Sequence, residues 1–170
     1  MKQLLIFLIV GFTALACKDN QDCSLPTSYE VDQARMLLDI ERIDQYLLDS
    51  AITAQVHESG IRYVIHATGA GNTADLCSYV TKQYALSLLD GTNVINLLGG
   101  VRAERSSLAL DMPAWQIGTP LVQDGGLITL FVPSPLGYGS SVRTFDNNGV
   151  NVTVPPNSIL IFTIAVISVE

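Results

Sequence analysis

The sequence predicts an α+β domain with an antiparallel sheet, one short central helix and a longer helix ahead of them. A series of short apolar runs, separated by glycine, asparagine and proline, extends from Ile61 to the end of the chain and indicates strands. Pro113 stands where a short helix can begin. Near the N-terminus the apolar residues instead recur at helical spacing and mark one face of a helix: Met36, Ile40, Ile43 and Leu47.

The N-terminus is typical of an export signal. Met1 and Lys2 precede an apolar stretch over residues 4–12 that is too short to span a bilayer, and small residues follow up to Cys17. We expect a signal peptide over residues 1–16 and a lipidated tether over residues 17–26. The stretch 13–17 resembles a bacterial lipobox, which implies a lipid on Cys17 and attachment to the outer membrane of the cell envelope, on its periplasmic or surface side. The alternative is an ordinary signal peptide cut after Ala16, with Cys17 left as a free thiol.

Residues 27–56 form the predicted helical segment, with the helix over about 28–49 and Thr27 or Ser28 as its N-cap. The acidic residues are expected mostly off the apolar face: Asp32, Asp39, Glu41, Asp44 and Asp49. We expect the helix to pack on the domain that follows, because an apolar stripe is usually buried. An interaction helix for a partner is the alternative.

The remaining elements follow from turn residues and apolar runs. Asp90-Gly91 is a hairpin signal that closes the longest strand. The predicted strands cover residues 61–67, 76–89, 94–97, 108–110, 127–132 and 159–169, with a helix over residues 113–122. Residues 133–157 are expected to be irregular apart from a turn at 146–149, and so long a segment in a compact domain is usually functional.

Charge and cysteines narrow the function classes. A net charge of −7 and nine scattered basic residues argue against a nucleic-acid partner, because phosphate binding needs clustered Lys and Arg. Besides Cys17, the chain has Cys23 and Cys77, which in an exported protein can form a disulfide. A buried Cys77 and an exposed Cys23 are the alternative.

A block of motifs in the last third of the chain carries the most information. It contains Trp115 within Ala-Trp-Gln-Ile-Gly, Tyr138 between two glycines, and Val154 before a Pro-Pro pair. These side chains can converge on a small apolar pocket with one phenolic donor. Their order and spacing resemble the FKBP-type peptidyl-prolyl cis/trans isomerases, and the resemblance covers residues 57–170. It implies an FKBP-like antiparallel sheet wrapped around a short helix. The preceding helix, with Asp-Gln-Tyr-Leu at residues 44–47, is similar to FKBP-like lipoproteins of Bacteroidetes.

The resemblance also implies a set of site residues. Trp115 would be the floor of a proline pocket, and Tyr138 would donate a hydrogen bond to the substrate carbonyl. The implied catalytic residues are Tyr138, Trp115, Phe162 and Tyr84. The implied substrate-binding residues are Val94, Ile95, Met112, Val154 and Leu108. Tyr84, Phe162, Val94 and Val154 also fit a plain sheet core.

Isomerisation requires no nucleophile, and we expect no cofactor and no metal. Rotation about an Xaa-Pro amide has a barrier of about 18–20 kcal/mol, because the C–N bond has partial double-bond character. A catalyst must therefore bind the twisted amide more tightly than either planar isomer. The twisted amide is less polar, so a dry aromatic pocket favours it.

The sequence departs from the family at several pocket positions. Val94 and Ile95 stand where the family usually has Phe-Asp, Ala114 replaces a glycine, and Asp111 stands where an aliphatic residue is common. The missing acid predicts weak turnover. Three functions therefore stay open: an isomerase assisting protein folding in the envelope, a non-catalytic proline-peptide binding module or chaperone, and an envelope scaffold. For the first two the expected partners are proline-containing unfolded or exported polypeptides.

Overall fold

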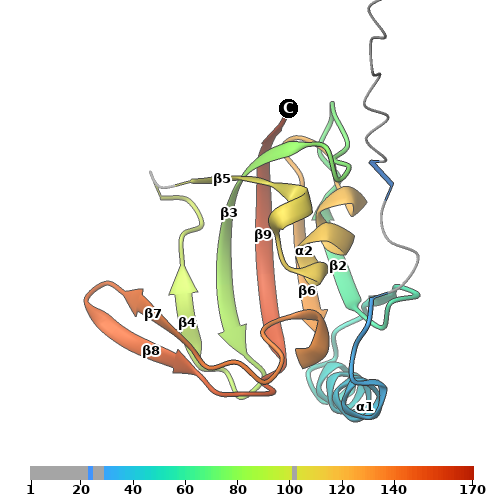
Figure 1. Cartoon of the computed structure of the whole chain (residues 1–170), viewed down its shortest axis with the longest axis vertical. Helices are drawn as coiled ribbons and strands as arrows, with labels where there is room; N and C mark the ends of the chain where they lie inside the picture. The colour runs from blue at the N-terminus through green and yellow to red at the C-terminus, as the bar shows by residue number, and fades with distance from the viewer. Residues whose placement is uncertain (1–22, 25–28, 101–102) are drawn as a thin grey trace, which may run out of the picture.

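A computed structural model describes residues 23–24, 29–100 and 103–170 of the chain (Figure 1). Within these residues, antiparallel strands form one sheet in the order β1-β2-β6-β9-β3-β4, and β5 also pairs with β3. A second, two-stranded sheet is the hairpin β7–β8. The strands are β1 (Gln55–Val56), β2 (Arg62–Ala67), β3 (Tyr79–Leu88), β4 (Asn93–Asn96), β5 (Glu104–Ser107), β6 (Leu127–Val132), β7 (Arg143–Asn147), β8 (Val150–Val154) and β9 (Leu160–Val169).

The short helix α2 (Pro113–Gly118) lies on one face of this sheet, in front of β9 and β6 (Figure 1). Alternate residues of β3 and β9 point toward it, and Phe162 and Leu130 are fully buried there. A Cβ added at Gly118 would lie 2.3 Å from Leu130 Cδ1, so only glycine lets α2 approach β6 this closely. The predicted α+β fold, with an antiparallel sheet around a short helix, is confirmed.

The N-terminal helix α1 (Gln33–Asp49) starts later than the sequence predicts. Its N-cap is Asp32, whose carboxylate accepts a hydrogen bond from Arg35 N at 2.9 Å, and residues 29–31 are not helical. The prediction of Thr27 or Ser28 as the cap is therefore wrong, although those two residues lie outside the described part of the chain.

The helix packs on the domain, as predicted. Ile43 is completely buried and Leu47 is buried, and both belong to one apolar cluster with Phe131 and Ile159. Met36 belongs to the main core. Asp39 was expected off this face but is completely buried, and its partners are described below.

Three elements differ from the prediction. Residues 108–110 form the 3-10 helix η1 (Leu108–Leu110) rather than a strand, and the strand β5 lies just before it, in a polar stretch without apolar alternation. The strand expected from residue 76 begins at Tyr79. The segment 133–157 is not irregular: it contains a 3-10 helix, η3 (Ser134–Leu136), and the β7–β8 hairpin. The turn of this hairpin lies at residues 146–149, as predicted, with positive φ at Asn148 and Gly149.

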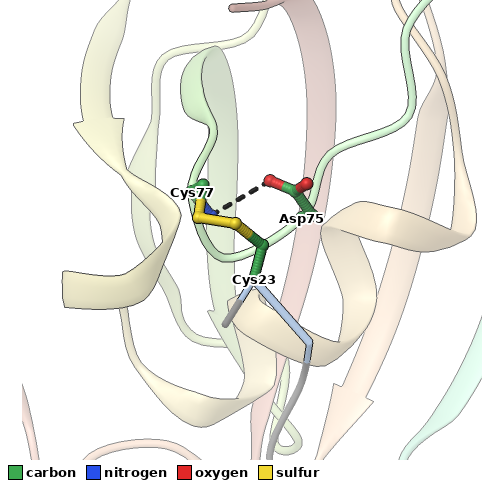
Figure 2. A group of neighbouring side chains, drawn as sticks. All are labelled: Cys23, Asp75 and Cys77. Atoms are coloured by element: carbon green, nitrogen blue, oxygen red, sulfur yellow. Dashed lines mark hydrogen bonds between the residues drawn. A yellow bond between two sulfur atoms is a disulfide. The ribbon is translucent and has the colours of Figure 1, made fainter. Parts of the chain in front are cut away.

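Cys23 and Cys77 form a disulfide, with their Cα atoms 5.2 Å apart (Figure 2). Leu76 N also donates a hydrogen bond to Cys23 O at 3.2 Å. The Asp75 carboxylate accepts hydrogen bonds from Cys77 N at 3.0 Å and from Ser78 Oγ at 2.8 Å, which fixes the turn before β3. Of the two alternatives for these cysteines, the structure has the paired one.

Residues 1–22 lie outside the described part of the chain, and with them the expected signal peptide and Cys17. Among the residues that are described, no helix combines the length and the apolar character needed to cross a membrane.

Candidate functional site

Three aromatic side chains from three elements meet on the inner face of the sheet. Trp115 of α2 has its ring centroid 4.9 Å from that of Tyr84 and 5.3 Å from that of Phe162, both in edge-to-face arrangements. Tyr84 and Phe162 are 6.1 Å apart. They come together because β3 and β9 are neighbours, with Tyr84 opposite Ile164 and Leu86 opposite Phe162. The structure thus joins three of the four residues predicted as catalytic.

A buried ion pair lies beside this cluster. The Lys82 ammonium is 4.5 Å from the centroid of the Trp115 ring and 2.7 Å from Asp111 Oδ2. It also donates a hydrogen bond to Ser106 Oγ at 2.5 Å, and the Ser106 hydroxyl is within 2.9 Å of Asp111 Oδ1. The Lys82 side chain is completely buried, so its charge is balanced by Asp111 and by the negative face of the indole.

Trp115 is held by these ring contacts and by the cation. Its indole Nε1 is buried and has no hydrogen-bond partner within the residues that the structure describes. The next residue, Gln116, fixes the helix from the other side: its Nε2 donates to Ala109 O at 3.0 Å and to Asp111 O at 2.9 Å. Its Oε1 accepts a hydrogen bond from the Tyr29 hydroxyl at 2.9 Å. The helix that carries Trp115 is therefore tied to η1 and to the segment before α1.

The other predicted lining residues belong to the same core. Val94, Val154 and Leu108 are fully buried in one cluster with Trp115, and Ile95 and Met112 are partly buried against it. Ile95 lies opposite Leu86 in the β3–β4 pair, so an aliphatic group occupies the position where the family has its acid. Asp111 does not replace that acid, because its carboxylate binds Lys82 and Ser106.

Tyr138 lies in the loop between η3 and β7. Its ring is partly buried against the main core, 5.9 Å from the ring of Phe145 and 5.8 Å from the Arg143 guanidinium. Burial, with a smaller contribution from Tyr84, raises the pKa of the Tyr138 hydroxyl well above its ordinary value. The hydroxyl is therefore protonated throughout the physiological range and can act as a hydrogen-bond donor.

Sequence reasoning missed the Lys82 network, although a signal was present. Val80, Lys82, Tyr84 and Leu86 alternate along β3, so the period of two places Lys82 on the inner face. A buried lysine needs a carboxylate partner. That partner is Asp111, which stands where the family commonly has an aliphatic residue.

The antiparallel sheet surrounds a short helix, and this helix carries a buried Trp that packs against two aromatic residues of the sheet. Prolyl isomerases share this fold class. The profile of the FKBP-type peptidyl-prolyl cis-trans isomerase family matches residues 71–167, which is more than half of the chain. The chain belongs to this family.

Curated relatives agree with this assignment. The chain is 30% identical over 113 residues to a probable FKBP-type peptidyl-prolyl cis-trans isomerase from Haemophilus influenzae, covering 66% of this chain and 44% of that protein. It is 31% identical over 114 residues to FkpA from Escherichia coli, with coverage of 66% and 38%. It is 30% identical over 112 residues to the outer membrane protein MIP of Legionella longbeachae, with coverage of 66% and 45%. The chain thus spans less than half the length of these relatives.

Solved structures share the fold. The crystal structure of FkpA from Escherichia coli aligns with a TM-score of 0.63 and 26% identity, over 81% of this chain and 64% of FkpA. A peptidyl-prolyl cis-trans isomerase from Pseudomonas syringae aligns with a TM-score of 0.60 at 18% identity, over 79% of this chain and 96% of the other, which is a likeness of fold alone.

Proposed function

We propose that this protein is a peptidyl-prolyl cis/trans isomerase that assists the folding of proline-containing exported polypeptides in the bacterial cell envelope. The observation that carries the proposal is the edge-to-face cluster of Trp115, Tyr84 and Phe162 in a chain of this family. Such a cluster can bind a proline ring through apolar contacts. It stabilises the twisted amide more than the planar one, and each 1.36 kcal/mol of that difference gives a tenfold rate increase.

We further propose that turnover is slow relative to the family. In the family the carboxylate at this position orients the hydrogen-bond donors of the pocket toward the substrate carbonyl, and Ile95 provides no carboxylate. Val94 is smaller than the phenylalanine usual in the family, so the pocket wall has less aromatic surface. Either change could cost about ten- to a hundredfold in rate, or about 1.4–2.8 kcal/mol of transition-state stabilisation.

The proposed location is the outer membrane, through a lipid on Cys17, as in FKBP-like lipoproteins of Bacteroidetes. Support comes from the short apolar stretch and small residues before Cys17, and from a relative whose name is outer membrane protein MIP. Mass spectrometry of the membrane fraction should find a chain that begins at Cys17 with added acyl mass. A soluble chain that begins at Cys17 without lipid contradicts the anchor.

The test of the activity is exchange NMR on a short Xaa-Pro peptide with the full chain, purified in detergent. Binding appears as broadened peptide signals, and turnover appears as faster cis/trans exchange. We expect both, and we expect Trp115→Ala to abolish both. A natural chain that binds the peptide without accelerating exchange would instead be a binding module or chaperone, and a chain that does neither would favour the scaffold function.

A further inference from the structure

We propose that helix α1 is a positioning element for Tyr138, and that Arg35 and Asp39 act as a clamp on both ends of the segment 133–157. This inference rests on the proposed isomerase function, because it assigns a role to residues that lie outside the aromatic cluster. Neither residue belongs to the proline pocket that the family resemblance implies. Both lie on α1, at the end of the domain where η3 and the start of β9 also lie (Figure 1).

The first end of the segment is held by Asp39. Its Oδ2 accepts hydrogen bonds from Ser134 N at 2.8 Å and from Ser134 Oγ at 2.5 Å. Both residues are completely buried, so water does not compete for these bonds. Ser134 begins η3, and its carbonyl accepts a hydrogen bond from Gly139 N at 2.9 Å. The contact from α1 therefore reaches the residue next to Tyr138.

The second end of the segment is held by Arg35. Its Nη2 donates to Asn157 O at 2.8 Å, and Asn157 N donates to Gly139 O at 2.7 Å. Gly139 thus uses both of its backbone groups, one toward each end of the segment. Its φ of +53° is a conformation that glycine adopts without strain.

Arg35 and Asp39 close these contacts into a ring. Arg35 Nη2 and Asp39 Oδ1 are 2.9 Å apart, an ion-pair contact rather than a hydrogen bond. The ring then runs from Asp39 through Ser134, Gly139 and Asn157 to Arg35. Tyr138 immediately precedes Gly139 within this ring, so its backbone position is set by α1 as well as by the sheet.

A positioning role explains why the Asp39 carboxylate is completely buried here, although the side chain of its partner Arg35 is 28% exposed. Replacing a buried ion pair by apolar groups is often neutral or stabilising, so stability alone does not favour Asp39 at this position. Hydrogen bonds that fix both ends of the segment 133–157 do favour Asp39 at this position. Because a donor displaced by about 1 Å can lose about a hundredfold in rate, loosening this ring should reduce catalysis without disturbing the aromatic cluster.

The experiment compares Asp39→Ala with Asp44→Ala in the full chain. Asp44 is a matched control on the same helix: it pairs with Arg62 of β2 at 2.8 Å, and its side chain is 50% exposed. Among the described residues, neither Asp44 nor Arg62 forms a side-chain hydrogen bond with the segment 133–157. Three quantities are measured: kcat and KM on a prolyl peptide, native-state amide exchange at Gly139 and Asn157, and the emission of Trp115, the only Trp in the chain.

We expect Asp39→Ala to lower kcat by about tenfold or more at nearly unchanged KM, since Tyr138 acts in the transition state. Exchange at Gly139 and Asn157 should become at least about tenfold faster, while the emission of Trp115 stays the same. Asp44→Ala should change none of these. If the two variants lose activity equally, α1 only stabilises the domain and the inference is wrong.

Two further variants keep the test decisive if Asp39→Ala does not fold. Asp39→Asn retains an acceptor for Ser134 and should restore most of kcat, whereas Ser134→Ala removes one donor and should speed exchange at Gly139. Unchanged exchange in Ser134→Ala would overturn the clamp. If the natural chain shows no turnover, the proposed function fails, but the difference in exchange between the Asp39 and Asp44 variants still decides whether α1 holds the Tyr138 loop.

Discussion

The buried pair between Lys82 and Asp111 gives the strongest stability prediction. Lys82→Met removes a completely buried ammonium and leaves the Asp111 carboxylate, 9% exposed, with Ser106 as its remaining side-chain partner. Breaking a buried ion pair from one side destabilises a protein by about 3–5 kcal/mol, because the other charge stays desolvated. The cation over the Trp115 ring is lost as well, and such a contact contributes up to about 2 kcal/mol when desolvated.

Removing both charges of the pair should not destabilise the protein. Lys82→Met with Asp111→Leu removes both charges of this pair, and such replacements are often neutral or stabilising by about 1–4 kcal/mol. The two substitutions are therefore strongly non-additive. Arg105→Met is the control for a surface pair: Arg105 and Glu170 are 50% and 60% exposed, and this change should cost less than about 1 kcal/mol.

Urea denaturation followed by Trp115 fluorescence measures these differences. With a slope of about 1–3 kcal/mol per M, the midpoint of Lys82→Met should fall by about 1 M or more. The midpoint of the double variant should return to the natural value or exceed it. If the single and double variants unfold at the same midpoint, the pair does not interact as described and the reasoning is refuted.

Three smaller predictions concern the disulfide, the contact between α2 and β6, and the burial of Tyr138. Replacing Cys23 and Cys77 by alanine should lower stability by about 2–4 kcal/mol in thermal unfolding, because the disulfide joins residues 54 positions apart; an unchanged melting curve would show that it does not constrain the unfolded chain. Gly118→Ala should cost about 1–3 kcal/mol, since its methyl group would meet Leu130, and equal stability would mean that α2 can move away from β6. The folded-state pKa of Tyr138 lies above its unfolded value of 10.0, so its contribution to stability is complete below pH 10 and is lost as the pH rises further. Tyr138→Phe should flatten the alkaline loss in a pH series of denaturation curves, and an unchanged alkaline limb would contradict this.

Local periodicity predicted most of the architecture. The face formed by Met36, Ile43 and Leu47 is buried as expected, and the strands that carry Tyr84 and Phe162 lie where their apolar alternation places them. The β7–β8 hairpin was missed although its turn was recognised. Its strands are polar and largely exposed, so they lack the alternation by which a half-buried strand is detected.

The charged residues were harder to place. Asp39 is three positions after Met36 and four before Ile43, so helical geometry puts it on the buried face. Its charge suggested a solvated position instead. What allows its burial is Ser134, 95 positions away, and no local pattern indicates such a partner. Lys82 is a similar case, since its partner Asp111 is 29 positions away and becomes its neighbour only when β3 and η1 pack together.

The most direct test of the account is the isomerisation rate of a prolyl peptide with the natural chain and with Val94→Phe combined with Ile95→Asp. We have proposed that the aromatic cluster is that of an isomerase and that positions 94 and 95 limit its rate. We expect a measurable but slow natural rate that rises by about tenfold or more in the double variant, with Trp115→Ala inactive in both backgrounds. A natural rate already typical of an efficient isomerase, or a double variant no faster than the natural chain, would contradict this proposal.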